Sequence, residues 1–264
     1  MDMKARDALA LELGHIVSEA GNVIMALRAS DVGARRKPDG SPVCEADTRA
    51  EQLILARLAA IMPDVTVIAE ESFVQRGGPV PGRFFLVDPL DGTREFLAGH
   101  HDFTVNVALV ENGDPIAAAI CAPALDQIYL AGATAFRAEP ARSGPLADAL
   151  QAIVTSPVPD AGLRAVASRS HMNAATEAWL RQRPLARLQR AGSSLKFCLI
   201  ARGDADVYPR VAPTMEWDTA AGHAILNAAG GCVIGLDGSP LRYGKSHAGF
   251  KNEGFVAWGR KPAQ

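Results

Sequence analysis

The sequence predicts a mixed α and β protein in two halves: an α+β half with an antiparallel sheet, then an α/β half with a mostly parallel sheet. Two observations support this fold class. Residues 84–139 contain several apolar, strand-length segments joined by short turns, which is typical of an antiparallel sheet. Residues 163–235 alternate strand-like and helix-like segments, which is typical of parallel sheets covered by helices.

Two helices are expected at the N-terminal end. A helix over residues 4–29 is predicted because apolar residues recur at helical spacing: Leu9, Leu13, Ile16, Val17, Ala20, Ile24 and Leu27. A second helix is expected to start at Asp47, to run to about Ala60 and to stop before Pro63. The segment KPDGSPVCEAD (37–47) between them is rich in turn residues, which predicts a loop or a short hairpin.

Strands should follow these helices. VTVIAEES (65–72) predicts a short strand that leads into two acids, and RFFLVDPLDGT (83–93) predicts a strand followed by a sharp turn. The segment VQRGGPVPG (74–82) between them has the composition of a surface loop. Apolar residues alternate over 103–110, Asn112-Gly113 is a strong hairpin turn, and IAAAICAP is the expected returning strand; QIYLAG and TAFRAE continue the sheet.

A boundary is expected in the segment 138–160, which is rich in proline, alanine and serine and would separate residues 1–150 from residues 151–264. Beyond it, the strand-like segments LRAVAS, DVYPR and GCVIG alternate with the helix-like segments AATEAWLRQR, LKFCLIARG and DTAAGHAILNAAGG. We therefore expect metal binding and catalysis in the first half and substrate binding in the second.

Composition narrows the class of protein. The formal net charge of the 264-residue chain is −2, which gives no electrostatic case for binding a nucleic acid polymer. The 4 cysteines are far apart in the sequence and predict free thiols in a reducing compartment. The N-terminus lacks the apolar core of a secretory leader, so the expected location is the cytoplasm. Peripheral membrane association and the oligomeric state stay open.

Carboxylates stand at predicted strand ends and helix starts. Asp47 and Asp218 each precede a helix, and a helix cap explains either residue alone. Asp88 and Asp91 are different, because an apolar strand delivers both into one short turn, where their charges repel unless a proton or a cation compensates. Carboxylate oxygens at this density suit Mg²⁺. Gly92-Thr93 then starts a helix whose free amides favour a phosphate. The spacing alone leaves phosphoryl chemistry and a structural cation site equally open.

Three motifs carry a family resemblance: AEES (69–72), DPLDGT (88–93) and EWDTAAG (216–222) resemble the signature motifs of the inositol monophosphatase superfamily. KPDGSPVCEAD, SRSH (168–171) and GSSLKFCLIARGDADVYPR (192–210) resemble the corresponding segments of CysQ-type 3′(2′),5′-bisphosphate nucleotidases. The resemblance implies a layered αβαβα sandwich. It also implies removal of the 3′-phosphate of adenosine 3′,5′-bisphosphate (PAP), a reaction of sulfur metabolism that gives AMP and phosphate. Whether the sulfated nucleotide PAPS is also a substrate stays open.

The resemblance also implies a metal site. Glu70, Asp88 and the carbonyl of Leu90 would bind a first Mg²⁺, and Asp88, Asp91 and Asp218 a second. A third, weaker ion would involve Glu70, and Li⁺ would inhibit by taking a Mg²⁺ position. The catalytic residues implied are Glu70 together with Asp47 and Thr93, the pair that orients the attacking water. Glu71 is expected to support the site without binding metal.

Substrate contacts are expected mainly in the second half. The residues implied are Gly92, Thr93, Ser168, Arg169, Gly192, Ser193, Ser194, Lys196, Arg210 and Asp218. Ser193 or Ser194 could also serve only as a helix cap. The cations among these residues suit the second, non-reacting phosphate of a bisphosphate.

Alternative functions remain at this point. Inositol-1-phosphate or fructose-1,6-bisphosphate hydrolysis would use the same metal chemistry, and a non-catalytic nucleotide or metal binder would use the same pocket. The intact pair Asp47 and Thr93 argues against a mere binder. Two residues depart from the family pattern: Cys44 replaces a threonine, and Glu253 replaces a proline.

Overall fold

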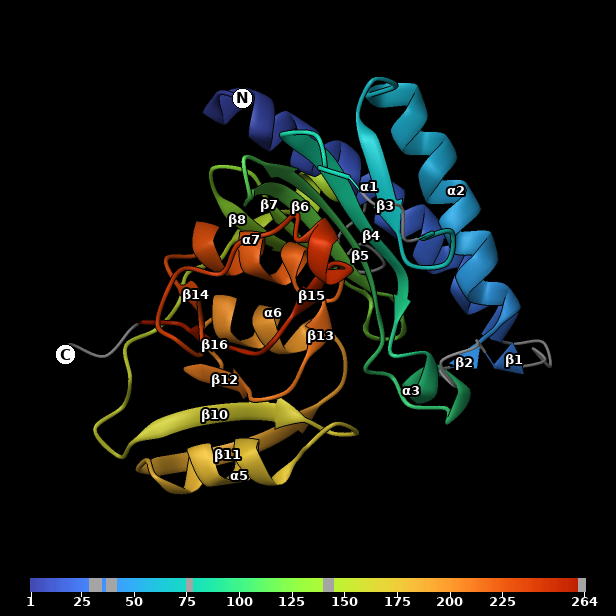
Figure 1. Ribbon diagram of the computed structural model, residues 1–264. Coiled ribbons are helices and arrows are strands. Elements are labelled where there is room, and N and C mark those ends of the chain that lie inside the picture. Colours follow the sequence, from blue (N-terminus) through green and yellow to red (C-terminus); the bar gives the residue numbers. More distant parts are fainter. Residues whose placement is uncertain (29–34, 37–41, 75–77, 140–144, 261–264) are drawn as a thin grey trace.

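A computed structural model describes residues 1–28, 35–36, 42–74, 78–139 and 145–260. Its elements form five layers (Figure 1): the helices α1 and α2, a large sheet, the helices α6 and α7, a second sheet, and the helix α5. This arrangement confirms the αβαβα sandwich. The expected loops over residues 37–47 and 74–82 and the expected boundary segment lie partly outside the described residues.

The elements of the first half largely follow the sequence-based expectations. Their bounds are α1 Met3–Arg28, β1 Arg35–Arg36, β2 Pro42–Val43, α2 Glu45–Ile61, β3 Thr66–Ala69, β4 Arg83–Asp91, α3 Thr93–Leu97, β5 Thr104–Glu111, β6 Asp114–Ala122, η1 Pro123–Leu125, β7 Gln127–Ala131, β8 Ala135–Ala138 and η2 Leu146–Ala149. The strand β2 lies within the segment 37–47 that is expected to be a loop or short hairpin, and it pairs antiparallel with β1, which lies just before that segment.

The second half contains more strands than its sequence pattern indicates. Its bounds are β9 Gln151–Ala152, β10 Leu163–Ser168, α5 Ala174–Arg181, β11 Leu185–Ala191, α6 Leu195–Ala201, β12 Val207–Arg210, β13 Thr214–Met215, α7 Ala220–Ala228, β14 Cys232–Gly235, η3 Ser246–Ala248, β15 Lys251–Asn252 and β16 Phe255–Trp258. The sequence analysis did not predict β11 or β16. β11 is an edge strand with mostly exposed side chains, so its apolar pattern is weak.

The first sheet has the order β3-β4-β5-β6-β7-β8-β9. All its pairs are antiparallel except β3–β4, which is parallel. A tight hairpin cannot join parallel neighbours, and residues 70–82 separate these two strands in the sequence. The second sheet has the order β11-β10-β12-β16-β14. Four of its strands run in one direction, and β16 runs in the opposite direction between β12 and β14, which confirms a mostly parallel sheet.

The strand β4 shows why its sequence is continuously apolar. Successive side chains point to opposite faces of the sheet: Phe85 and Val87 pack in the cluster that contains α1 and α2, whereas Phe84 and Leu86 pack in the cluster that contains α6 and α7. The second cluster draws residues from both halves. The two halves therefore share an apolar core, and the division at residues 150 and 151 stays a prediction.

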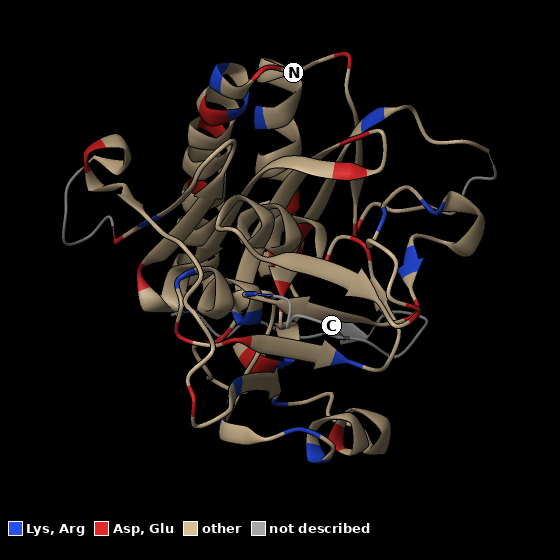
Figure 2. Ribbon diagram, turned by 90° about the vertical axis from the view of Figure 1, so that its left-hand side faces the viewer, with Lys and Arg blue, Asp and Glu red and all other residues tan. Residues whose placement is uncertain are grey.

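Figure 2 shows that Lys and Arg (blue) and Asp and Glu (red) are interspersed along the ribbon. This distribution agrees with the small net charge of −2. Among the helices of the described residues, none is both long enough and apolar enough to cross a lipid bilayer.

Candidate active site

The predicted site residues come from many elements and meet where strands end and helices begin. Glu70 directly follows β3, Asp88 and Asp91 lie in the last part of β4, and Asp218 lies shortly before α7. A register irregularity between Asp88 and Asp91 ends the regular pairing of β4 with β5 and lets the chain turn into α3. Gly92, which makes this turn, has a φ of 94°.

The carboxylates of Glu70, Asp88 and Asp218 form a compact cluster, because each contributes an oxygen that lies within 4.8 Å of the others. Asp88 is buried, and burial raises its pKa well above the usual range; repulsion from Glu70, Asp91 and Asp218 raises it further. Carboxylates this close repel one another unless a proton or a cation compensates their charge. A hard divalent cation supplies that compensation through the oxygen ligands that it prefers, so these residues fit a metal site.

The neighbouring backbone and carboxylates are held in place by hydrogen bonds. Asp88 Oδ1 accepts a hydrogen bond from the amide of Leu90 at 3.0 Å. Asp91 Oδ2 accepts one from the amide of Ser194 at 2.6 Å, which binds the first half to the second. Burial, followed by the charge of Asp218, raises the pKa of Asp91 to about 7. Asp218 Oδ2 accepts hydrogen bonds from the Thr214 hydroxyl and, at 3.1 Å, from the Met215 amide.

Asp47 and Thr93 are in direct contact. The Thr93 hydroxyl donates to Asp47 Oδ1 at 3.0 Å and lies 3.2 Å from the carbonyl oxygen of Leu90. The other oxygen of Asp47 accepts hydrogen bonds from the amide and the thiol of Cys44, each at 2.8 Å. Burial raises the pKa of Asp47, although these hydrogen bonds oppose the shift. The carboxylate is thus fixed on both oxygens, and one of them faces the Thr93 hydroxyl.

A cavity of about 260 Å³ lies over the acid cluster. Its lining includes all the predicted metal-binding residues, namely Glu70, Asp88, Leu90, Asp91 and Asp218. It also includes most of the predicted substrate residues, namely Gly92, Thr93, Ser168, Ser193, Lys196 and Arg210. Acids from β3, β4 and the start of α7 therefore share one cavity with cations from α6 and β12.

Three predicted substrate residues do not line this cavity. Arg169 forms an ion pair with Asp102 at 3.0 Å, and the amide of Gly192 donates to the same carboxylate at 2.6 Å. The hydroxyl of Ser194 is buried against Thr104, at 2.8 Å, and Asn106, at 2.6 Å. The structure places Gly192 and Ser194 on either side of Ser193, which does line the cavity.

Cavity residues that the sequence analysis missed include Arg94, His171 and Tyr208. Burial lowers the pKa of His171, and the positive charges of Arg210 and Arg94 lower it further. Lys196 is buried and its ammonium group lies 5.0 Å from the centre of the Tyr208 ring. Each missed residue stands inside or next to a motif that had been noted, DPLDGT, SRSH or VYPR, and only the fold shows that their side chains reach the same cavity.

Glu71 and Trp217 take supporting positions. The amide of Glu71 donates to Glu51 Oε2 at 2.8 Å, which anchors the turn after β3. Trp217 lines the cavity but is buried, and its ring packs on Phe73 with a centroid distance of 5.4 Å. That contact joins the segments that carry Glu70 and Asp218.

Comparison with known proteins identifies the class that this fold and site define. Residues 6–258 match the model of the inositol monophosphatase family, so the chain belongs to that family. Among curated proteins, the chain is 40% identical over 247 residues to the 3′(2′),5′-bisphosphate nucleotidase CysQ of Buchnera aphidicola subsp. Acyrthosiphon pisum, covering 92% of this chain and 90% of that protein. It is also 40% identical to the protein of the same name from Escherichia coli (strain K12), covering 83% of this chain and 86% of that protein.

Superposition on solved structures supports the same family assignment. The crystal structure of CysQ from Bacteroides thetaiotaomicron, described as a bacterial member of the inositol monophosphatase family, superimposes with a TM-score of 0.80 at 34% identity, covering 96% of this chain and 98% of that one. The Thermotoga maritima IMPase superimposes with a TM-score of 0.74 at 24% identity, covering 93% and 90%. The similarity to the Thermotoga maritima IMPase shows only that the two chains share a fold.

Proposed function

We propose that this protein is a metal-dependent phosphatase that removes the 3′-phosphate of PAP to give AMP and inorganic phosphate. One observation carries the proposal: a single cavity pairs the acid cluster of Glu70, Asp88 and Asp218 with the cations Arg94, Lys196 and Arg210. The acids suit a metal beside the reacting phosphate. The cations suit a second phosphate on the same substrate. The names of the curated relatives support the same reaction.

Mg²⁺ is the cofactor that the acids fit best. Glu70, Asp88 and the Leu90 carbonyl would hold one ion, and Asp88, Asp91 and Asp218 another; a third ion beside Glu70 and inhibition by Li⁺ are part of the same proposal. When bound, such ions neutralise charge on the phosphate oxygens and make a water more acidic. All five residues line the cavity, so their oxygens are available to it.

Asp47 and Thr93 act on the water. Because the Thr93 hydroxyl donates its proton to Asp47, its oxygen lone pairs are free to accept a hydrogen bond from a water in the cavity. The pair thereby aims that water at phosphorus. The water oxygen forms the new bond to phosphorus, and the bond between phosphorus and the 3′-oxygen of the ribose breaks. One hydrogen of the water stays on the phosphate, and the 3′-oxygen takes up the proton that the water gives up. The products are AMP and inorganic phosphate, and no covalent enzyme intermediate is required.

The second phosphate lies toward the cations in this proposal. Lys196, Arg210 and Arg94 line the cavity, and Ser168 and Ser193 offer hydroxyls at the same cavity. Burial and the positive charges of Arg210 and Arg94 lower the pKa of His171, which disfavours its charged form. Guanidinium and ammonium groups bind phosphate strongly where water is partly excluded. An inositol monophosphate lacks the group that would use them.

A reducing compartment such as the cytoplasm fits this proposal. The four cysteines, Cys44, Cys121, Cys198 and Cys232, are free thiols in the described structure, and three of them are buried. Free buried thiols are typical of proteins that work where glutathione keeps cysteines reduced.

The deciding assay measures phosphate release in the presence of Mg²⁺ from PAP, PAPS, inositol-1-phosphate and fructose-1,6-bisphosphate at equal concentrations. Asp91→Asn serves as the inactive reference. We expect the highest kcat/KM with PAP. Faster release from the inositol or sugar phosphate would retain the metal chemistry and reject the substrate. Release that is unchanged by Asp91→Asn would reject the site itself.

A further inference from the structure

Asp102 lies between the two glycine turns of the site. Its backbone touches Gly92 on one side: a Cβ built on Gly92 would lie 3.4 Å from the carbonyl oxygen of Asp102 and 3.3 Å from the Cα of Phe103. On the other side is Gly192, where a Cβ would overlap the same carbonyl oxygen and lie 3.0 Å from the Asp102 carboxylate. Gly92 belongs to the turn that carries Thr93, and Gly192 to the turn that carries Ser193.

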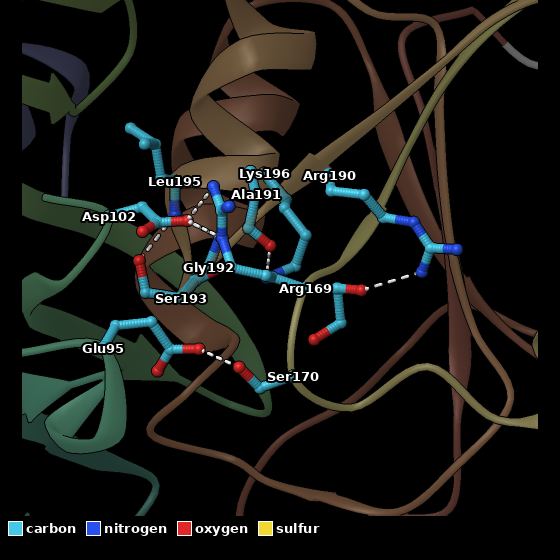
Figure 3. A network of polar contacts seen from close by, with 11 residues as sticks. Glu95, Asp102, Arg169, Ser170, Arg190, Ala191, Gly192, Ser193, Leu195 and Lys196 are labelled. Atoms are coloured by element: carbon cyan, nitrogen blue, oxygen red, sulfur yellow. Dashed lines mark hydrogen bonds and ion pairs between the residues drawn. The ribbon is translucent and has the colours of Figure 1, made fainter. Parts of the chain in front are cut away.

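The side chain of Asp102 fastens the second of these turns. Its Oδ2 atom accepts hydrogen bonds from the Gly192 amide at 2.6 Å and from Arg169 Nε at 3.0 Å, as Figure 3 shows. The residue is buried, with 8% of its surface exposed. Burial by itself raises the pKa of Asp102, but the hydrogen bond from Gly192 and the Arg169 guanidinium outweigh it and lower that pKa. The carboxylate is therefore a firm, charged acceptor.

The turn at Ser193 needs such support. Ser193 has a φ of 45°, a left-handed conformation that is unfavourable for a serine. Its carbonyl accepts a hydrogen bond from the Lys196 ammonium, which also lies 3.5 Å from the carbonyl of Ala191. The position of Ser193 thus decides where the Lys196 ammonium lies, and both line the cavity.

Ser193 is held from both neighbours. After it, the Ser194 amide donates to Asp91, and the Ser194 hydroxyl contacts Asn106 and Thr104. Before it, Asp102 is the group that binds the Gly192 amide. Asp91, Thr104, Asn106 and Asp102 all belong to the first half, so the substrate-binding turn is fastened at two points to the half that carries the metal ligands.

We propose that Asp102 is a positioning residue that sets the place of Ser193 and Lys196 relative to Thr93. It does not line the cavity and does not touch substrate; it acts through the Gly192 amide. The inference rests on the proposed phosphatase function. It also gives Arg169 a different role from the one that the sequence indicated: Arg169 completes the charge balance of Asp102 and does not bind the substrate phosphate.

The test compares steady-state kinetics on PAP with Mg²⁺ for Asp102→Ala, Asp102→Asn and Arg169→Ala. Asp114→Ala is the matched control, because it removes a carboxylate whose ion pair with Arg242 is 56% exposed on both sides. Asp102→Ala leaves the buried Gly192 amide without its charged acceptor, so we expect the KM for PAP to rise about tenfold or more. Asp102→Asn keeps an oxygen that can accept from that amide, so its KM for PAP should lie close to the wild-type value. Arg169→Ala should change KM less than Asp102→Ala.

A second readout separates positioning from general damage. The increase in melting temperature caused by saturating Mg²⁺ should be the same in Asp102→Ala and wild type, because Glu70, Asp88 and Asp218 are untouched. If Asp102→Ala is too unstable to assay, Asp102→Ser replaces it, since serine also lacks the carboxylate that accepts from the Gly192 amide.

Three results would overturn the inference: an unchanged KM in Asp102→Ala, a larger KM increase in Arg169→Ala, or a lost Mg²⁺ response in Asp102→Ala. The wild-type protein is assayed first. A wild type that does not release phosphate from PAP contradicts the proposed function, whereas an active wild type with a silent Asp102→Ala contradicts only the positioning role.

Discussion

The Thr93 hydroxyl donates a hydrogen bond to Asp47 at 3.0 Å although 46 residues separate the two in the sequence. Asp47 lies in the first turn of α2 and Thr93 begins α3, so the contact joins two helix starts beside the end of β4. The second oxygen of Asp47 is occupied by Cys44, which leaves the carboxylate a single orientation toward Thr93. In the proposed mechanism, this fixed orientation is what directs the attacking water.

Thr93→Ala should lower kcat for PAP by about 100-fold or more, since it removes the group that aims the water. KM should change little, because the cations of the cavity remain. Thr93→Ser keeps the hydroxyl and should retain most of kcat. Steady-state kinetics at saturating Mg²⁺ measure both constants, and a change in KM alone would mean that Thr93 binds substrate rather than water.

Asp88→Asn should make the metal-free protein more stable and inactive. Asp88 is buried beside Glu70, Asp91 and Asp218, and their repulsion disfavours its charged form. The asparagine oxygen can still accept from the Leu90 amide, so the turn is preserved. We expect the free energy of unfolding without Mg²⁺ to rise by about 0.5–2 kcal/mol, the size that is common for single stabilising substitutions.

Chemical denaturation with and without Mg²⁺ tests this prediction. The wild type should gain stability on adding Mg²⁺, and Asp88→Asn should gain much less. An Asp88→Asn protein that is less stable than the metal-free wild type would show that the carboxylate is compensated by protein groups alone.

Arg94→Ala should raise the KM for PAP by about tenfold, because it removes an exposed cation from the cavity wall. Arg181→Ala is the control, since Arg181 lies on α5 and its side chain is 70% exposed in a pair with Glu177. The KM for inositol-1-phosphate, measured in the same assays, should change less. Equal effects on the two substrates would contradict a role for Arg94 at the second phosphate.

Cys44→Thr should raise the free energy of unfolding by about 0.5–1 kcal/mol, because a hydroxyl is a better partner than a thiol at a helix start. The Cys44 thiol now contacts Asp47 at 2.8 Å, and burial followed by that hydrogen bond raises the pKa of the thiol to about 12. It therefore stays protonated, and activity does not depend on its ionisation. Urea denaturation checks the stability; a lower kcat in Cys44→Thr would show that the thiol itself is needed.

The buried His223 should make the free energy of unfolding decrease as the pH falls. It is buried on α7 with its Nδ1 atom 3.0 Å from the Tyr243 hydroxyl, and burial, followed by the charge of Arg242, lowers its pKa from 6.5 to about 3. Because the unfolded chain takes up this proton first, the contribution of neutral His223 is complete above pH 6.5 and is lost as the pH falls toward 3.

Urea denaturation between pH 7 and pH 4, compared with His223→Gln, isolates this contribution. The difference in unfolding free energy between the two proteins should shrink with falling pH by at most about 1.4 kcal/mol per unit. Parallel pH profiles for the two proteins would show that His223 takes up its proton as readily in the folded state as in the unfolded chain.

Local patterns explain which parts of the fold were predicted correctly. The alternation in β5 and the turn Asn112-Gly113 depend on neighbouring residues, and the structure confirms both. The edge strand β11 was missed because most of its side chains are exposed, which leaves no apolar alternation to detect. The strand β16 was missed although it is fully buried, and its place between β12 and β14 depends on pairing with distant strands.

The sequence by itself determined the chemistry of the acids. DPLDGT places two carboxylates at the end of an apolar strand, where their charges repel unless a proton or a cation compensates, and oxygen ligands at this density suit a divalent cation. Motifs indicated Lys196 and Arg210 as cations of the site, and only the tertiary structure decided between Arg94 and Arg169. Arg94 lines the cavity, whereas Arg169 is neutralised by Asp102, a partner 67 residues away. The physical reason is that the direction of a side chain and the charges around it depend on the segments that the fold packs beside it. Those segments are distant in the sequence, so the spacing of residues does not reveal them.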